Sequence, residues 1–317
     1  MQVYLPIAEM PINIILILSL GLVTGFLAGT FGIGGGFLAT PFLIFIGIPP
    51  AISVATSANQ IFASSVSGLF CQLKKGAVDI RMGLFLLIGG IIGSSIGVSI
   101  FKILKESGQI DLAIAISYVV FLGSISVLML RDSIKTFMRK KYHLSFDNAG
   151  EGDEPAKQSK LYAKILKFID KLPYKIYFPK SEIEVSAIVP IILSVAIGIL
   201  VSLMGIGGGF LMIPAMIYIL RMPSSMVVGT SLFQIIFIAS NATFLQAYTN
   251  NTIDIVLAFL MIISSAVGAQ IGTRAGYKLD ADKMRFLLSI LLFTVCCKMF
   301  ISLFTVPADL FMIELIK

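Results

Sequence analysis

Gly32-Ile33-Gly34-Gly35-Gly36-Phe37-Leu38 occurs twice in this chain, and it returns unchanged as Gly205-Ile206-Gly207-Gly208-Gly209-Phe210-Leu211. Each copy lies between two apolar runs and is followed by a proline, Pro41 or Pro214. Glycine readily adopts positive φ and is a poor helix former, so four glycines in five positions break a helix. One glycine would suffice for a tight turn between packed helices, which is the alternative. We therefore interpret each copy as a helix break beside a shared substrate site.

The composition is that of an integral membrane protein. Of 317 residues, 57% are hydrophobic and only 13% are charged, whereas soluble domains carry about 25% charged residues. The apolar runs are long enough to span a bilayer as helices and lack the alternation of a β-barrel. The net charge of +7 comes from residues in the loops, as the positive-inside rule expects, and does not indicate nucleic-acid binding. The sequence predicts an all-α polytopic membrane protein with the lipid bilayer as its surroundings.

No catalytic or metal-binding pattern accompanies the glycine motifs. Cys71, Cys296 and Cys297 lie inside apolar runs without the spacing of metal ligands. The glycine motif lacks the strand context of a nucleotide fingerprint, and no Walker lysine follows it. We predict no enzyme activity, no metal and no cofactor.

The chain aligns with itself at a shift of 173 to 175 residues. The matching positions are Pro50 with Pro223, Thr56-Ser57 with Thr230-Ser231, Gln60 with Gln234, Asp79 with Asp254, and Gly93 and Gly97 with Gly268 and Gly272. We predict two repeats of five apolar segments each, at 12–31, 34–48, 51–73, 78–101 and 110–130, then 187–204, 207–220, 225–248, 253–277 and 284–304. The predicted division of the chain is 1–131 for the first repeat, 132–185 for a linker, and 186–317 for the second repeat.

An odd number of segments predicts that the second repeat is inverted relative to the first. The loop after the third segment carries Lys74, Lys75 and Arg81, whereas its counterpart at 249–252 carries no charge. Inversion places the charged loops on one side, which is then cytoplasmic, with both termini outside. Lys102 and Lys105, in a predicted loop at 102–109, do not fit this rule.

The second segment of each repeat leaves two alternatives open. It holds about 15 residues, or roughly 22 Å of helix, and a full crossing of the hydrocarbon core needs about 30 Å. The first two segments of each repeat therefore either cross fully or form a re-entrant hairpin that turns at the glycine motif.

The central stretch at 131–186 is polar. Residues 148–160 read as a linker, and apolar residues then recur at helical spacing among lysines over 160–172. This pattern predicts a basic amphipathic helix that either lies on the membrane surface or caps the bundle.

The residues around the breaks favour a small anion as substrate. Helices that start just after Gly34 and Gly207 present free N–H groups and a positive dipole end. Inverted repeats bring two such ends together near the midplane. Hydroxyl and amide side chains on the next helices could complete the site, although such groups often only bond neighbouring helices. The candidate residues are Gly34, Gly35, Gly36, Thr56, Ser57, Asn59, Gln60, Gly207, Gly208, Gly209, Thr230, Ser231, Gln234 and Asn241.

Three charged residues lie in or next to apolar runs. Lys298 sits deep inside one, where a charge is costly, so we predict that it neutralises the anion. The alternative is that it snorkels or pairs within the bundle. Asp79 and Asp254 each begin a span, where stabilisation of a helix N-terminus is favoured over proton coupling.

The doubled motif, 32–41 and 205–214, together with Gly229-Thr230-Ser231-Leu232, resembles the sulfite exporter TauE/SafE family of membrane permeases. The resemblance covers nearly the whole chain except the central loop. The first repeat departs from it with Ala55-Thr56-Ser57-Ala58, so the two halves of a site could be unequal.

The resemblance implies a secondary transporter in the bacterial inner membrane that exports sulfite or a short organosulfonate such as sulfoacetate. An anion channel, or a membrane enzyme or scaffold that acts through the central loop, are the alternatives. The sequence leaves open which anion is carried, whether a proton or cation is coupled, and the oligomeric state.

Overall fold

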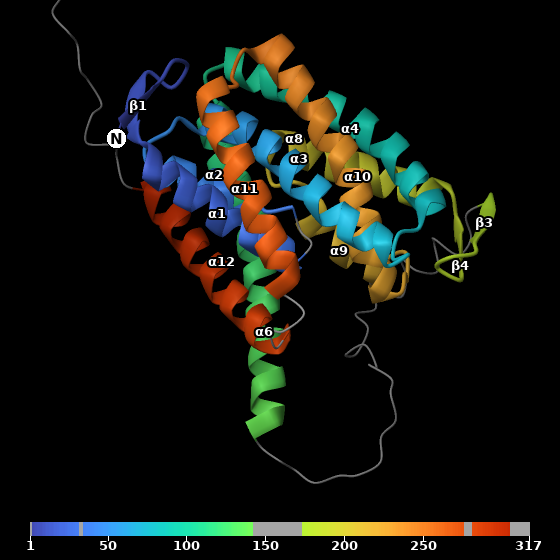
Figure 1. Ribbon diagram of the computed structural model, residues 1–317. Coiled ribbons are helices and arrows are strands. Elements are labelled where there is room, and N and C mark those ends of the chain that lie inside the picture. Colours follow the sequence, from blue (N-terminus) through green and yellow to red (C-terminus); the bar gives the residue numbers. More distant parts are fainter. Residues whose placement is uncertain (1, 32–33, 142–172, 276–280, 305–317) are drawn as a thin grey trace, which may run out of the picture. The chain divides into compact units, whose positions relative to one another are not determined.

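The computed structural model describes residues 2–31, 34–141, 173–275 and 281–304 (Figure 1). Six helices in this part of the chain are long and apolar enough to cross a membrane: 14–31, 80–106, 110–131, 225–250, 255–275 and 286–303. The all-α polytopic prediction is confirmed. The chain forms two compact units, one of Met1–Gly108 with Ser145–Leu279, the other of Gln109–Leu144 with Asp280–Lys317. Each unit combines pieces from both ends of the chain, and the predicted three-part division stays a prediction.

The first unit contains the same series of elements twice: a β-hairpin, a long helix, a short helix and two long helices. We call β1 to α4 the first half and β3 to α11 the second half. The first half is β1 (Gln2–Leu5), β2 (Met10–Asn13), α1 (Ile14–Phe31), α2 (Gly36–Phe45), α3 (Pro50–Lys74) and α4 (Ile80–Glu106). The second half is β3 (Lys175–Phe178), β4 (Ile183–Ser186), α8 (Ile188–Met204), α9 (Gly209–Tyr218), α10 (Ser224–Leu245) with the π-helix η2 (Gln246–Asn250), and α11 (Ile255–Ala275).

The two β-hairpins are a feature that sequence reasoning missed. Residues 1–11 read as a short lead and 175–186 as part of a polar loop. The signal was present, because Val3-Tyr4-Leu5-Pro6 matches Ile176-Tyr177-Phe178-Pro179 at the shift of the glycine motifs. Both hairpins are antiparallel, and their loops place equivalent glutamates at positive φ, Glu9 at 53° and Glu182 at 52°.

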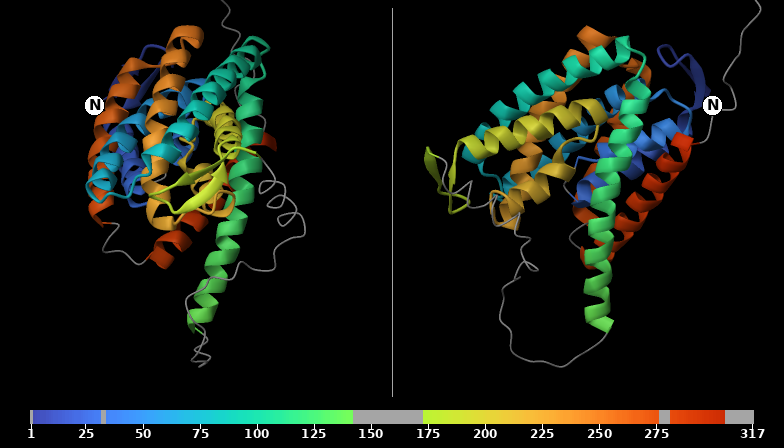
Figure 2. Two further views of the ribbon diagram at one scale, coloured as in Figure 1. Left: turned by 90° about the vertical axis from the view of Figure 1, so that its right-hand side faces the viewer. Right: turned by 180° about the vertical axis from the view of Figure 1, so that it is seen from behind.

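The fourth helix of each half packs against the first helix of the other half through glycines. A Cβ added to Gly89 or Gly93 on α4 would lie 2.3 and 2.2 Å from the carbonyl oxygens of Ile191 and Val195 on α8. These glycines therefore permit close packing of the two helices. Figure 2 shows α4 and α8 side by side.

Helix α11 approaches α1 in the same way. A Cβ on Gly25 or Gly29 would lie 2.3 and 2.2 Å from the carbonyl oxygens of Ser265 and Ala269. Residue numbers rise together along α1 and α11, as they do along α4 and α8, so each pair runs parallel. Parallel pairing of a first helix with the opposite half's fourth helix supports the predicted inversion of the repeats.

The short helices favour the re-entrant alternative. Helix α2 has 10 residues, or about 15 Å, which is half the roughly 30 Å of a hydrocarbon core. Its end returns toward the hairpin that precedes α1, because a Cβ on Gly47 would lie 3.5 Å from Cε of Met10. Helix α9 also has 10 residues.

Hydrophobic cores unite each hairpin with helices of both halves. One core joins Leu5 of the first hairpin to α1, α2, the start of α3, and Leu257 and Met261 of α11. Its counterpart joins Phe178 of the second hairpin to α8, α9, the start of α10, and Met82 of α4. Neither half buries its apolar surface alone.

The second unit contains α5 (Ile110–Ser117), the π-helix η1 (Tyr118–Leu122), α6 (Gly123–Lys141) and α12 (Ala281–Phe304). Gly123 faces α12, because a Cβ there would lie 3.0 Å from Sγ of Cys296. The predicted fifth segment is therefore real but continues beyond Leu130 to Lys141. The predicted amphipathic helix at 160–172 and the linker at 148–160 lie outside the described residues.

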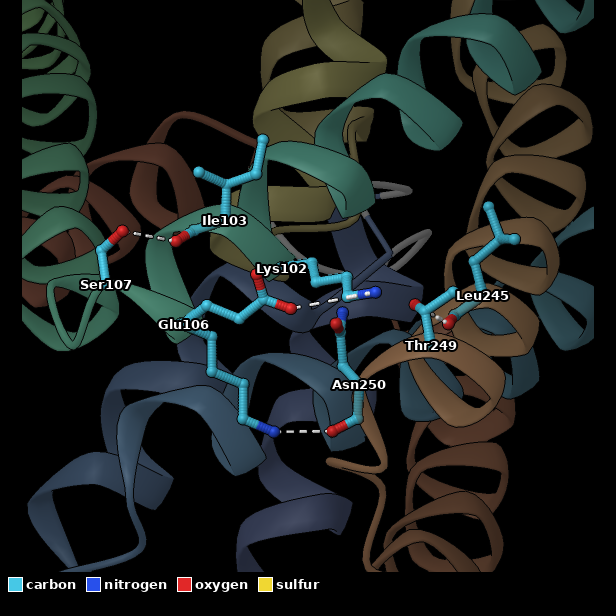
Figure 3. A network of polar contacts seen from close by, with 8 residues as sticks. Lys102, Ile103, Glu106, Ser107, Leu245, Thr249 and Asn250 are labelled. Atoms are coloured by element: carbon cyan, nitrogen blue, oxygen red, sulfur yellow. Dashed lines mark hydrogen bonds and ion pairs between the residues drawn. The ribbon is translucent and has the colours of Figure 1, made fainter.

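The predicted loop at 102–109 was wrong, because α4 continues to Glu106. Lys102 and Glu106 form an i,i+4 ion pair at 3.8 Å, which supports an exposed helical turn. Lys105 Nζ donates a hydrogen bond to the carbonyl oxygen of Asn250 at 2.6 Å. Figure 3 shows Lys102, Glu106 and Asn250 at the end of α4. Of the two lysines that did not fit the charge rule, Lys102 thus contacts the last turn of α4, and Lys105 links this turn to the end of η2.

Candidate substrate site at the two glycine motifs

Both glycine motifs break their helices, as predicted. Helix α1 ends at Phe31 and α2 begins at Gly36, whereas α8 ends at Met204 and α9 begins at Gly209. Equivalent glycines in the two breaks have positive φ, 90° and 72° at Gly34 and Gly35 and 83° and 62° at Gly207 and Gly208, and Gly205 in the second break is also at 65°. L-residues with side chains avoid this region, so the breaks require glycine.

The two breaks touch each other. A Cβ on Gly36 would lie 2.6 Å from the carbonyl oxygen of Gly205, and one on Gly34 would lie 3.5 Å from that of Gly207. Directly after the breaks, the rings of Phe37 and Phe210 stack with centroids 5.0 Å apart. The starts of α2 and α9 are therefore neighbours, and each start is the positive end of its helix dipole.

A polar stripe on α3 lies beside the first break. We call Thr56, Gln60, Ser64 and Ser67 the α3 stripe, because their spacing of four, four and three residues places them on one helix face. Gln60 Nε2 donates to Thr24 Oγ1 on α1, and Ser64 Oγ donates to the carbonyl oxygen of Gly34 at 3.1 Å. The stripe therefore faces α1 and the break.

Several oxygens of this region have no hydrogen-bond partner among the described residues. They are Thr56 Oγ1, Gln60 Oε1 and Ser67 Oγ of the stripe, and Ser65 Oγ beside it. Thr56, Gln60 and Ser65 are each 0% exposed, and Ser65 Oγ would lie 3.5 Å from a Cβ on Gly34. Buried polar atoms are nearly always paired, so a group of unpaired ones beside a helix break indicates a ligand site.

The equivalent α10 stripe, Thr230, Gln234, Ile238 and Asn241, is used differently. Thr230 Oγ1 accepts a hydrogen bond from the Asp79 backbone N–H at 3.0 Å. Gln234 Nε2 donates to Ser194 Oγ, and Asn241 Nδ2 donates to Ser94 Oγ at 2.8 Å. These bonds tie α10 to α4 and α8. Gln234 Oε1 is the atom of this stripe that has no partner in the described part of the chain.

Ser57, Ser231 and Asn59 bond their own helices. Ser57 Oγ donates to Ser53 O at 2.7 Å, and Ser231 Oγ donates to Val228 O at 2.9 Å. Asn59 Nδ2 reaches Ala55 O at 3.5 Å. Their predicted roles in substrate binding stay predictions.

Asp79 and Asp254 cap helices α4 and α11, as predicted for a carboxylate at a helix N-terminus. Asp79 accepts from the Met82 N–H at 3.1 Å and Asp254 from the Leu257 N–H at 3.1 Å. Each also accepts a bond from the opposite half's hairpin, which sequence reasoning did not find. Ser181 Oγ donates to Asp79 Oδ2 at 2.6 Å, and the Ile7 N–H donates to Asp254 Oδ2 at 2.9 Å.

Lys298 lies on α12 in the second unit, and its side chain is exposed. Its predicted role in neutralising an anion stays a prediction. Within the described residues, no group of three or more His, Cys, Asp or Glu side chains could hold a metal ion.

Known proteins resemble this chain over most of its length. The model of the sulfite exporter TauE/SafE family matches residues 17–299. The Bacillus subtilis probable membrane transporter protein YunE is 25% identical over 90% of this chain and 97% of its own. A probable membrane transporter protein of Methanocaldococcus jannaschii is 26% identical over 87% of this chain and 91% of its own. Sulfite exporter TauE/SafE family protein 2 of Arabidopsis thaliana is 30% identical, over 30% of this chain and 21% of its own. No solved structure matches significantly.

Proposed function

Because this chain belongs to the sulfite exporter TauE/SafE family and is a multi-pass membrane transporter, we propose that it exports a small sulfur-containing anion by alternating access. Sulfite and short organosulfonates such as sulfoacetate are the proposed substrates. The protein acts without a cofactor or a catalytic step, in a bacterial inner membrane, with the central loop in the cytoplasm and both termini outside.

The observation that carries this proposal is the contact between the two helix breaks. The two helix N-termini meet, and Phe37 and Phe210 stack just behind them. The backbone N–H dipoles of these termini can bind an anion without a charged side chain at the site. The proposed site comprises the glycines of both breaks and the polar residues of the α3 and α10 stripes with their neighbours. Lys298 is proposed to add a positive charge to the anion's path.

Burial of the polar residues favours a transporter over a channel. Thr56, Gln60 and Thr230 are 0% exposed, whereas the polar lining of an open pore would be in contact with water. The two halves would have to move for an anion to reach these groups from either side, which is alternating access. With the inside negative, the membrane potential favours export of a monoanion by about 2.3 kcal/mol per 100 mV, so a coupled proton or cation is not required.

Counterflow in proteoliposomes tests the proposal. Vesicles loaded with unlabelled sulfite should accumulate radiolabelled sulfite, and external sulfite or a short sulfonate should compete while chloride does not. Absence of exchange by folded protein would refute anion transport. Exchange that never saturates, together with single-channel current, would favour the channel instead.

A further inference from the structure

The geometry points to a narrower substrate class, which rests on the proposed function. We propose that the transported anion carries one O–H or N–H donor in addition to its oxyanion group, and that Gln60 Oε1 accepts a hydrogen bond from this donor. This class retains hydrogen sulfite, which carries a proton, and excludes sulfoacetate, which has no O–H or N–H as a dianion. The donor of the substrate is then recognised in the first half, by the α3 stripe.

The orientation of the Gln60 amide follows from its partner. Thr24 Oγ1 donates its one hydrogen within α1, to Leu20 O at 2.8 Å or Gly21 O at 3.2 Å. It can therefore only accept from Gln60, so the NH₂ end of the amide faces Thr24. The end that remains is Oε1, which accepts hydrogen bonds and cannot donate.

An unpaired Oε1 is costly where Gln60 lies. The residue is 0% exposed, and Oε1 has no partner among the described residues. A buried acceptor without a donor loses its hydration with nothing in return. A ligand that brings a donor removes this penalty, whereas a ligand of the same shape without a donor retains it.

The groups around Gln60 Oε1 complement the rest of such a ligand. Thr56 lies one turn, about 6 Å, before Gln60 on the same face, and Ser65 lies beside the first break. Their hydroxyl oxygens are also without partners, and a hydroxyl can donate to an oxyanion. Ser67 lies two turns, about 10 Å, beyond Gln60, which is too far for one small anion to contact both. Two hydroxyl donors and one obligate acceptor match an oxyanion that carries one donor of its own.

The second half lacks this combination. Ile238 and Ala239 replace Ser64 and Ser65, and Thr230 is already bonded to the Asp79 N–H. Gln234 Oε1 is unpaired but has no neighbouring set of unpaired hydroxyls on its stripe. The donor of the substrate is therefore assigned to Gln60 rather than to its counterpart.

Two sulfonates of equal charge and similar size test this assignment. Competition of 2-hydroxyethanesulfonate and ethanesulfonate against radiolabelled sulfite is measured in counterflow, in sodium and in potassium buffers. The half-inhibitory concentration of 2-hydroxyethanesulfonate should be at least about tenfold lower than that of ethanesulfonate in both buffers. Gln60→Leu should bring this ratio close to one. Gln72→Leu, the same change farther along α3, should preserve the wild-type ratio.

The outcomes separate the inference from the proposed function. If no anion competes, the proposed function fails. If both sulfonates compete equally well with the wild-type protein, anion transport stands and the donor requirement is wrong. If the two sulfonates compete differently in potassium but equally in sodium, Oε1 binds a cation rather than the donor of the substrate. If Gln234→Leu abolishes the preference for the hydroxylated sulfonate and Gln60→Leu retains it, recognition lies in the second half. Either result overturns the inference.

A second measurement does not depend on the variant folding. In detergent, 2-hydroxyethanesulfonate should raise the thermal midpoint of the wild-type protein more than ethanesulfonate does at the same concentration, because tighter binding stabilises the folded state more. Equal shifts would contradict the donor requirement.

Discussion

The α3 and α10 stripes begin alike, with Thr56 and Gln60 on one and Thr230 and Gln234 on the other, and are used differently. On α3 three stripe oxygens are left without partners. On α10, Thr230 and Asn241 are bonded to the start and the middle of α4. Equivalent residues in a duplicated fold thus have different roles. The α3 stripe is available to a ligand, whereas the α10 stripe holds helices together.

The largest effect is expected where the two breaks touch. In Gly36→Ala the added Cβ would lie 2.6 Å from the carbonyl oxygen of Gly205, a distance that forces the breaks apart. Misplacement of a site by about 1 Å can cost roughly a hundredfold, so sulfite counterflow should fall by about that factor or more. Gly108→Ala is the control for an added Cβ that meets no neighbour, because nothing lies within 4 Å of it, and it includes the strain of a positive φ, 67°, which Gly36 does not have. Equal losses in both variants would show that contact between the breaks is not required.

The equivalent threonines should give opposite results. Thr56→Ala removes a hydroxyl without a partner, so it should weaken sulfite affinity by about tenfold and leave stability unchanged or higher. Thr230→Ala removes the acceptor of the Asp79 N–H, so it should lower the unfolding free energy by about 1–3 kcal/mol with a smaller change in affinity. Counterflow KM and thermal unfolding in detergent measure the two effects. If Thr230→Ala weakens affinity more than Thr56→Ala does, the division of work is the reverse of the one proposed.

Much of this comparison was predictable from the sequence, because duplication makes equivalent residues visible. The breaks follow from the glycine content, the paired Thr and Gln positions from the self-alignment, and the helix-capping role of Asp79 and Asp254 from their positions at the starts of spans. The hairpins escaped because four-residue strands carry too weak a pattern to stand out from a lead or a loop.

The different use of the two stripes could not be predicted from either stripe. Thr230 and Asn241 find their partners on α4, which belongs to the other half. Which polar groups are paired therefore depends on how the halves interlock. The internal alignment compares residues of like position and contains no information on contacts between unlike positions.

Replacement of Asp79 and replacement of Asp254 should lower the stability of the protein by different amounts, with little difference in transport. Asp254 accepts bonds from three backbone N–H groups, those of Ile7, Val256 and Leu257. Asp79 accepts from the Met82 N–H and the Ser181 hydroxyl. Loss of a helix cap costs about 0.5–2 kcal/mol, and each buried donor left unpaired adds to this. Asp254→Ala should therefore lower the thermal midpoint more than Asp79→Ala, and Asp254→Asn should recover part of the loss. The opposite order would mean that the hydroxyl contact to Asp79 is the stronger one.

The smallest effect is expected at the lysines that bridge the halves outside the site. Lys105 donates to Asn250 O at 2.6 Å, and Lys180 donates to Val78 O at 3.1 Å. Each bond links one half to the segment that precedes the last helix of the other half, α11 or α4. Both bonds are near the surface, where such contacts contribute about 0.5–1 kcal/mol. Lys105→Met and Lys180→Met should each lower stability by no more than this and leave sulfite KM unchanged. A larger loss of transport in Lys105→Met than in Lys180→Met would mean that the end of α4 (Figure 3) takes part in the movement between the halves, because a static contact of this size cannot alter the site.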